Sequence, residues 1–181
     1  MVDKPSSIVR PATPHDAGAC QEIYRHYVDN TAITFENDVP TIDEMAGRIE
    51  SALASHEWLV LEHGGTVIGY AYAHPLGTRA AYQWSVETSI YIAADQHRSG
   101  GGRALYTELL RRLGERGYRR ALACITQPNP ASNAFHESFG FEHVGLFRRV
   151  GWKLGSWHDV AWMQRDLQCE TASNDPPTTL R

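Results

Sequence analysis

Three consecutive glycines, at residues 100–102, separate a predicted β-strand from a predicted amphipathic helix. The strand, residues 85–92, is apolar and β-branched, and the helix, residues 102–116, repeats leucine and alanine on one face. Glycine lets the backbone turn tightly and approach a ligand closely, and the amides that begin a helix bind anions. Arg98 and Arg103 flank the glycines and add positive charge for a diphosphate. The junction therefore predicts a phosphate-binding turn between a strand and a helix.

Two common phosphate-binding motifs do not match this junction. A mononucleotide P-loop requires Lys followed by Ser or Thr, and neither pair follows the glycines. A dinucleotide fingerprint requires a third Gly or an Ala, where this chain has Leu105. The loop by itself also allows a glycine-rich connection that binds nothing.

The remaining segments predict a mixed α/β domain. Alternating or continuous apolar runs predict strands at residues 7–10, 58–61, 67–72, 85–92, 121–126, 142–147 and 160–167. Capping residues and helical periodicity predict helices that begin after Thr13 and Thr41 and helices at residues 102–116 and 130–138. Residues 7–167 are expected to form one domain, between disordered tails at residues 1–6 and 168–181 that carry too little apolar surface to fold.

Composition excludes several classes of function. The formal net charge is −4 and the two signs are mixed along the 181 residues, which argues against a nucleic-acid partner. No apolar run reaches the ~20 residues that span a bilayer, so no membrane association is expected. Three widely spaced cysteines predict neither a disulfide framework nor a zinc site, and single scattered histidines predict no metal. A reducing cytoplasm fits this cysteine usage.

A second motif accompanies the glycine loop. Residues 129–141, NPASNAFHESFGF, follow the predicted strand at residues 121–126. The two motifs, in this order and spacing, resemble the two acetyl-CoA elements of the GNAT acetyltransferase superfamily. The resemblance covers residues 7–167 and implies a mixed, mostly antiparallel GNAT-type sheet flanked by helices, with acetyl-CoA as co-substrate. His97 stands where the family usually has Gln or Arg.

Within this superfamily, residues 31–36, 79–87 and 151–160 are most similar to phosphinothricin and methionine sulfoximine N-acetyltransferases. This resemblance implies a small-molecule acceptor whose α-amine is acetylated, and a homodimer. Leu76 and Gly77 replace an aromatic and a basic residue common in this subgroup, which leaves the acceptor open. The alternatives are an enzyme for another amine (a polyamine, an aminoglycoside or a protein N-terminus) and a non-catalytic acyl-CoA-binding module.

The chemistry of acetyl transfer suggests roles for individual residues. An amine attacks a thioester as its free base, so Glu87, the only carboxylate in its strand, is the expected proton acceptor. His136 stands where many relatives have Tyr, and it either protonates the departing thiolate or contacts CoA. The guanidinium of Arg79 suits a carboxylate or phosphinate on the acceptor.

The expected ligand contacts form two groups. The residues expected to hold acetyl-CoA are Ile90, Tyr91, Ile92, His97, Arg98, Ser99, Gly100, Gly101, Gly102, Arg103, Asn129 and Ser132. The residues expected to bind the acceptor are Phe35, Glu36, Arg79, Tyr82, Ser85 and Val86.

Overall fold

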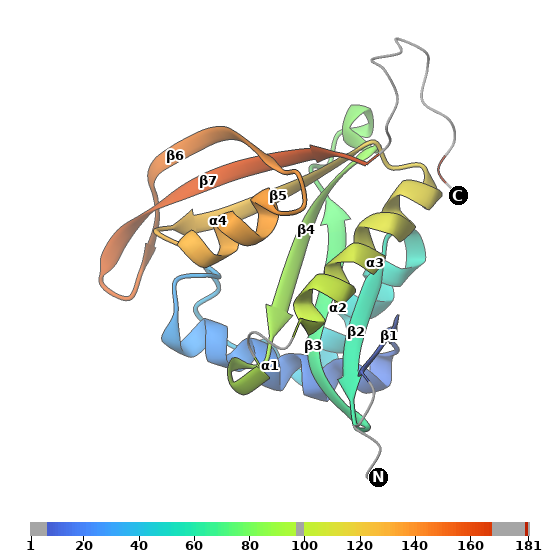
Figure 1. The fold of residues 1–181 in the computed structure, drawn as a ribbon. Helices are drawn as coiled ribbons and strands as arrows, with labels where there is room; N and C mark the ends of the chain where they lie inside the picture. Colours follow the sequence, from blue (N-terminus) through green and yellow to red (C-terminus); the bar gives the residue numbers. More distant parts are fainter. Residues whose placement is uncertain (1–6, 97–99, 168–179, 181) are drawn as a thin grey trace.

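The computed structural model describes residues 7–96, 100–167 and 180. Its centre is a seven-stranded sheet in the order β1-β2-β3-β4-β5-β7-β6 (Figure 1). Only the β4–β5 pair is parallel, which confirms the predicted mixed, mostly antiparallel sheet. The strands are β1 (Ser7–Pro11), β2 (Trp58–His63), β3 (Thr66–Pro75), β4 (Ser85–Ile92), β5 (Arg120–Gln127), β6 (Glu142–Lys153) and β7 (Ser156–Asp166).

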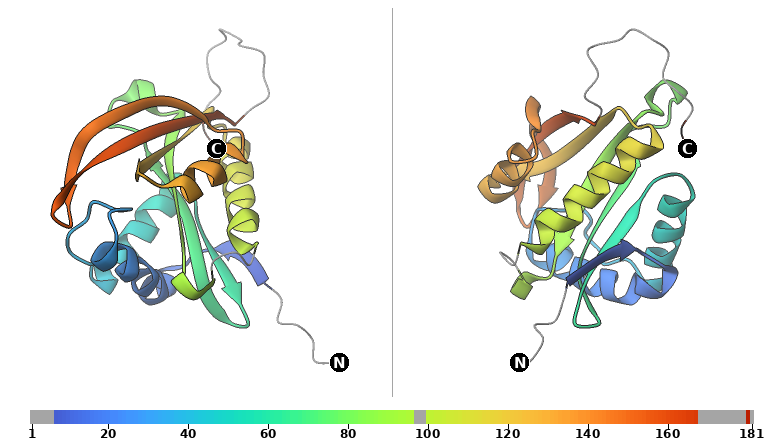
Figure 2. Two further views of the ribbon diagram at one scale, coloured as in Figure 1. Left: turned by 60° about the vertical axis from the view of Figure 1, so that its left-hand side comes forward. Right: turned by 45° about the vertical axis from the view of Figure 1, so that its right-hand side comes forward.

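Helices cover both faces of this sheet, as the two views of Figure 2 show. They are α1 (Ala17–Asn30), α2 (Ile42–Ser55), α3 (Gly101–Arg116) and α4 (Pro130–Glu137). On one face, α3 buries Leu105, Leu109 and Leu113 against β2 to β5. On the other face, α1 and α2 bury Tyr24 and Ile49 against aromatic side chains of β2, β3 and β4. The two cores are therefore separated by the sheet.

Local signals explain where α2 and α3 begin or end. The Thr41 backbone N–H donates to Glu44 Oε2 at 2.7 Å and the Glu44 N–H donates to Thr41 Oγ1 at 3.2 Å, which is a reciprocal capping box. At the end of α3, Gly117 has φ 101° and the Tyr118 N–H donates to the Leu113 carbonyl at 3.1 Å. This left-handed residue ends the helix and turns Tyr118 into the core.

The first predicted helix begins differently from the expectation. Residues 14–16 form a 3₁₀ turn, and α1 starts only at Ala17. The reason lies in Asp16, whose carboxylate accepts two hydrogen bonds from Arg10, at 2.9 and 2.8 Å, and one from the Thr13 N–H. These bonds tie the turn to β1 and satisfy the backbone before the helix begins.

The last two strands are longer than predicted. Pairing of β6 with β7 continues through residues 151–153 and 156–158, where the sequence predicts a loop. Register shifts near Gly145 and before Gly151 interrupt the alternation of apolar and polar residues. The hairpin turns at Leu154 and Gly155, which have φ values of 51° and 75°.

Most of the two predicted tails lies outside the described residues. Leu180 is the exception, since it is half-buried and packs against the core on the α3 face. Among the described helices, none is long and apolar enough to span a membrane.

Candidate active site

The strands β4 and β5 separate in the middle of the sheet. They pair only where residues 85–87 meet residues 120–122. Beyond this point a slot of about 60 Å³ opens between them, lined on the β4 side by Ser89, Ile90 and Tyr91 and on the β5 side by Cys124 and Thr126. The separation exposes backbone that a continuous sheet would cover.

Ile92 does not belong to this lining. Its carbonyl accepts a hydrogen bond from the Tyr27 hydroxyl at 2.6 Å, and its N–H donates to the same hydroxyl at 3.3 Å. Of the three strand residues predicted to hold acetyl-CoA, Ile90 and Tyr91 line the slot. The backbone groups of Ile92 are bound by α1, whereas its side chain lies beside Gly102 at the start of α3.

The helix α3 begins next to β4. Gly100 is its N-cap, with φ 81°, and a Cβ there would meet no atom within 4 Å. A Cβ on Gly102 would lie 3.7 Å from Ile92 Cγ1, an ordinary contact, so the protein itself does not require glycine at this position. The open space and the helix N-terminus suit an anionic group. The predicted contacts His97, Arg98 and Ser99 lie outside the described residues.

Arg103, on the first turn of α3, faces α4. Its Nη2 donates to Ser138 Oγ at 3.1 Å, and its guanidinium lies 4.9 Å from the centroid of the Phe139 ring. These residues line a cavity of about 520 Å³ that also contains Arg111 and Arg165. Ser138 was not among the predicted contacts, although it is the second Ser of the motif at residues 129–141.

The helix α4 places three of the predicted residues along the slot, namely Asn129, Ser132 and His136. Asn129 Oδ1 accepts from the Ser132 N–H at 3.1 Å and so caps the helix. Pro130 occupies the first helical position, where no N–H is needed. The capping interaction fixes the turn that carries these side chains.

His136 is buried, with an exposed fraction of 4%, and its two ring nitrogens differ. Nδ1 lies 2.8 Å from the Ser132 carbonyl oxygen, which can only accept, so Nδ1 carries the hydrogen. Nε2 has no partner in the described part of the chain. Burial lowers the pKa of His136, which favours the neutral ring with a lone pair on Nε2. Of the two predicted roles, this arrangement favours contact with a ligand N–H over proton donation by His136.

Glu87 lies on β4, directly opposite His74 of β3 in the antiparallel register. Its side chain is 22% exposed, and its Oε1 lies 3.9 Å from His74 Nε2. Burial raises the pKa of the Glu87 carboxyl, and the positive charge of a protonated His74 opposes this rise. A carboxyl with a raised pKa is a stronger base once it is ionised.

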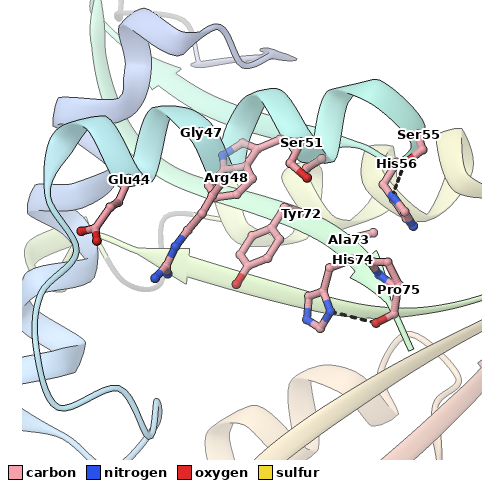
Figure 3. Close-up of a pocket in the computed structure, with 12 residues that line it drawn as sticks. Glu44, Gly47, Arg48, Ser51, Ser55, His56, Tyr72, Ala73, His74 and Pro75 are labelled. Carbon is pink, nitrogen blue, oxygen red and sulfur yellow. Dashed lines mark hydrogen bonds between the residues drawn. The ribbon is translucent and has the colours of Figure 1, made fainter. Parts of the chain in front are cut away.

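A groove of about 550 Å³ lies beside this pair, between α2 and β3 (Figure 3). Arg48 on the helix and Tyr72 and His74 on the strand extend into the space between the two elements (Figure 3). The complete lining is Glu44, Gly47, Arg48, Ser51, Ala52, Ser55, His56, Trp58, Tyr72, Ala73, His74 and Pro75. None of these residues was predicted from the sequence to belong to a site.

The residues predicted to bind the acceptor do not line this groove and lie in several different parts of the structure. Glu36 accepts two hydrogen bonds from Arg48, at 2.7 and 3.0 Å, and so lies beside the groove. Phe35 packs so closely on Gly151 of β6 that a Cβ at Gly151 would overlap its ring. Arg79 precedes a 3₁₀ turn, residues 80–82, in the exposed connection from β3 to β4.

The last three predicted acceptor residues lie in or near this connection. Tyr82 is exposed and Ser85 is half-buried at the start of β4. The side chain of Val86 is fully buried in the core on the α3 face, so its assignment as an acceptor contact is wrong for the side chain.

The chain is similar to known proteins over most of its length. Residues 9–162 match the family model described as acetyltransferase (GNAT) domain. The chain is 36% identical to a phosphinothricin N-acetyltransferase of Streptomyces viridochromogenes, over 96% of this chain and 92% of that protein. It is 32% identical to an L-methionine sulfoximine/L-methionine sulfone acetyltransferase of Salmonella typhimurium, over 88% and 94%. The crystal structure of a phosphinothricin acetyltransferase from Sinorhizobium meliloti in complex with AcCoA is similar, with a TM-score of 0.89 and 38% identity, covering 95% of this chain and 93% of that one.

Proposed function

The chain belongs to the GNAT acetyltransferase family, and on this premise we propose that it acetylates the α-amine of a small amino-acid analogue such as phosphinothricin or methionine sulfoximine. The relatives that carry these names support the choice of acceptor. The observation that carries the proposal is the position of Glu87, which lies on the strand that borders the slot and opposite His74, a residue that lines the groove.

The described residues fit acetyl-CoA, which supplies the acetyl group. The N-terminus of α3 suits the pyrophosphate, since Gly100 leaves open space and the helix dipole favours negative charge. The cavity beside Arg103 and Ser138 suits the more distant phosphate of the nucleotide. The unpartnered Nε2 of His136 suits an amide N–H of the pantetheine arm in the slot.

Glu87 has the properties of the general base. Its carboxylate accepts a proton from the acceptor ammonium, directly or through a water molecule, and leaves the amine free to attack the thioester carbonyl. The backbone N–H of Ile90, on the edge of β4 that faces β5, can stabilise negative charge that develops on this carbonyl oxygen.

For the acceptor, we propose that the groove beside Glu87 receives the amine and side chain. Arg79 then binds the carboxylate from the connection between β3 and β4, which leads directly into the strand of Glu87. Phe35 and Glu36 form the opposite wall, where the β6–β7 hairpin packs on residues 34–36.

A competition assay tests this function. The protein is given acetyl-CoA with phosphinothricin, methionine sulfoximine, spermidine and a ribosomal peptide, and each acetylated product is quantified. Preference for the amino-acid analogues is expected. Preference for spermidine or the peptide would contradict the proposed class of acceptor, but the protein would still be an acetyltransferase. If none of the amines causes release of CoA beyond the rate of spontaneous hydrolysis, the protein is a non-catalytic acyl-CoA-binding module.

We also propose a homodimer formed through the outer face of the β6–β7 hairpin. This hairpin carries large exposed apolar side chains, which are Val144, Leu146, Phe147, Val150, Trp152, Leu154 and Trp157. A cluster of this kind typically marks an interaction surface. Sedimentation of the wild type and of Trp152→Ser, with a dimer expected only for the wild type, tests this assembly.

A cytoplasmic location, suggested by the free thiols of Cys20 and Cys124, is a further proposal that cell fractionation tests.

A further inference from the structure

Glu87 has a titratable neighbour on the adjacent strand. His74 and Glu87 are directly opposed in the antiparallel β3–β4 pair, so both side chains leave the sheet on the same face. Their side chains are 40% and 22% exposed, and His74 Nε2 lies 3.9 Å from Glu87 Oε1. At this separation a charge on the imidazole acts directly on the carboxyl.

A hydrogen bond fixes which nitrogen of His74 faces Glu87. Nδ1 lies 3.2 Å from the Pro75 carbonyl oxygen (Figure 3), and because a carbonyl only accepts, Nδ1 carries a hydrogen. Nε2 therefore carries a lone pair in the neutral ring and a hydrogen in the protonated ring. Only the protonated ring stabilises the Glu87 carboxylate.

The charged groups of α2 that line the groove are already bound elsewhere. Arg48 donates two hydrogen bonds to Glu36, and Glu44 accepts the backbone N–H at the helix start. His56 stacks on Tyr118, and its pKa is lowered by burial and then by the charge of His74. The neutral form of His56 is therefore favoured.

Two further titratable groups on the neighbouring strands, Tyr72 and Cys124, stay neutral. Tyr72 packs beside His74 with 5.9 Å between the ring centroids, and burial raises the pKa of its hydroxyl. On β5, burial raises the pKa of the Cys124 thiol to about 12. Within the described part of the chain, His74 is the one group whose charge is found to act on Glu87.

We propose that His74 is a positioning residue for acetyl transfer: its protonated ring holds Glu87 as a carboxylate and so determines how far into the acid range the enzyme keeps its base. This inference rests on the proposed function, in which one proton passes from the acceptor ammonium to Glu87 and then to solvent. His74 takes no part in this transfer. Without His74, burial alone acts on Glu87, and the carboxyl takes up a proton at higher pH.

Two substitutions separate charge from shape. His74→Gln removes the charge and keeps a polar side chain, whereas His74→Lys supplies a positive charge throughout the assay range. The ratio kcat/KM for the acceptor is measured from about pH 5.5 to pH 9 for both variants, for the wild type and for His15→Gln. His15 is an exposed residue of the turn before α1 and serves as the matched control.

The acid limb of the His74→Gln profile is expected about one pH unit above that of the wild type, the lower end of the range for an opposite charge at this distance. The His74→Lys limb is expected at or below the wild-type pH, and His15→Gln is expected to match the wild type. Acetyl-CoA affinity, measured by calorimetry, should be the same in all four proteins. The titration of the acceptor amine is common to all profiles and cancels in the comparison.

A His74→Gln limb that coincides with the wild type overturns the inference, as does a His74→Lys limb displaced like that of His74→Gln. If His74→Gln does not fold, His74→Asn replaces it in the same comparison. Glu87→Gln distinguishes failure of the proposed base, Glu87, from failure of the role inferred for His74. If Glu87→Gln keeps the wild-type rate, the proposed base and this inference both fail; if it is slow while His74→Gln is unchanged, only the inference fails.

Discussion

Lys153 Nζ donates a 2.8 Å hydrogen bond to the carbonyl oxygen of Thr34, which lies 119 residues earlier in the chain. Lys153 ends β6 and is buried, with an exposed fraction of 5%. The bond joins the β6–β7 hairpin to the segment that carries Phe35 and Glu36. Burial lowers the pKa of Lys153, so its ammonium is held at this point at a cost in solvation.

Replacement of Lys153 tests this link. Lys153→Met keeps the length of the side chain but leaves the Thr34 carbonyl without its donor. A buried acceptor without a partner costs about 1–3 kcal/mol, so the free energy of unfolding in urea should fall by about this amount. Arg148→Met, at an exposed position of the same strand, is the control and should change stability by less than about 0.5 kcal/mol. Equal stabilities of the two variants would contradict the link.

The glycine loop can be tested at Gly102. The nearest atom to a Cβ there is 3.7 Å away, so Gly102→Val should fold while its side chain enters the phosphate site. We expect acetyl-CoA affinity to fall at least about tenfold in calorimetry, equivalent to about 1.4 kcal/mol. Gly18→Val on α1, where a Cβ would lie 3.9 Å from Ile42, is the matched control. A folded Gly102→Val with full affinity would place the phosphates elsewhere.

Glu87→Gln keeps the size of the side chain and removes its basic oxygen. Loss of a general base costs about 10²-fold in kcat, and acetyl-CoA affinity should not change. Because burial raises the pKa of Glu87, the wild type should lose activity as the pH falls through this raised value, and the variant should lack that limb. Glu22→Gln, exposed on α1, should behave as the wild type. If Glu87→Gln keeps a near wild-type rate at every pH above and below this limb, the assignment of Glu87 as the base is falsified.

His136→Phe distinguishes contact with CoA from proton donation. The ring of His136 packs edge-on against Tyr106 and Phe141, and Phe keeps this packing while removing Nε2. If Nε2 accepts a hydrogen bond from the ligand, the KM for acetyl-CoA should rise about 3- to 10-fold, since a hydrogen bond contributes about 0.5–1.5 kcal/mol. The value of kcat should change little. A large fall in kcat at constant KM would restore the proton-donor role.

Arg79→Ala tests how the acceptor carboxylate is bound. The KM for the acceptor should rise by about 10- to 100-fold, the loss expected for a charged hydrogen bond, and kcat should change less. Arg79→Lys should recover only part of this loss, because Lys lacks the two-pronged guanidinium. For an acceptor analogue without a carboxylate, wild type and Arg79→Ala should be equally poor. If Arg79→Ala binds the normal acceptor as well as the wild type, another group binds the carboxylate.

Most of the fold could be predicted because its signals are local. The capping box at Thr41 and Glu44, the glycine that ends α3 and the periodicity of each helix depend on residues close in sequence. The length of the β6–β7 hairpin does not, because its register shifts near Gly145 and Gly151 are stabilised by pairing across the strands. Pairing of this kind is a tertiary property that the apolar pattern of one strand does not reveal.

The same distinction explains the site. Glu87 and Val86 are consecutive strand residues and face opposite sides of the sheet, so strand periodicity argues against both lining one pocket. The same rule places Tyr72 and His74 on one face of β3 and could have identified them as neighbours. The groove itself depends on how α2 packs on β3, and the ring orientation of His136 depends on a carbonyl one turn earlier. Neither can be read from residue types.

The separation of β4 from β5 also bears on how the protein holds together. A sheet that stops pairing after residue 87 leaves peptide groups along two strand edges in its middle, where a continuous ladder would otherwise stabilise the native state. A ligand that lies along these edges can form hydrogen bonds to the peptide groups that have no partner strand. Acetyl-CoA would then act as a removable strand as well as a reactant, and the two halves of the sheet would be joined most firmly while the reaction is in progress.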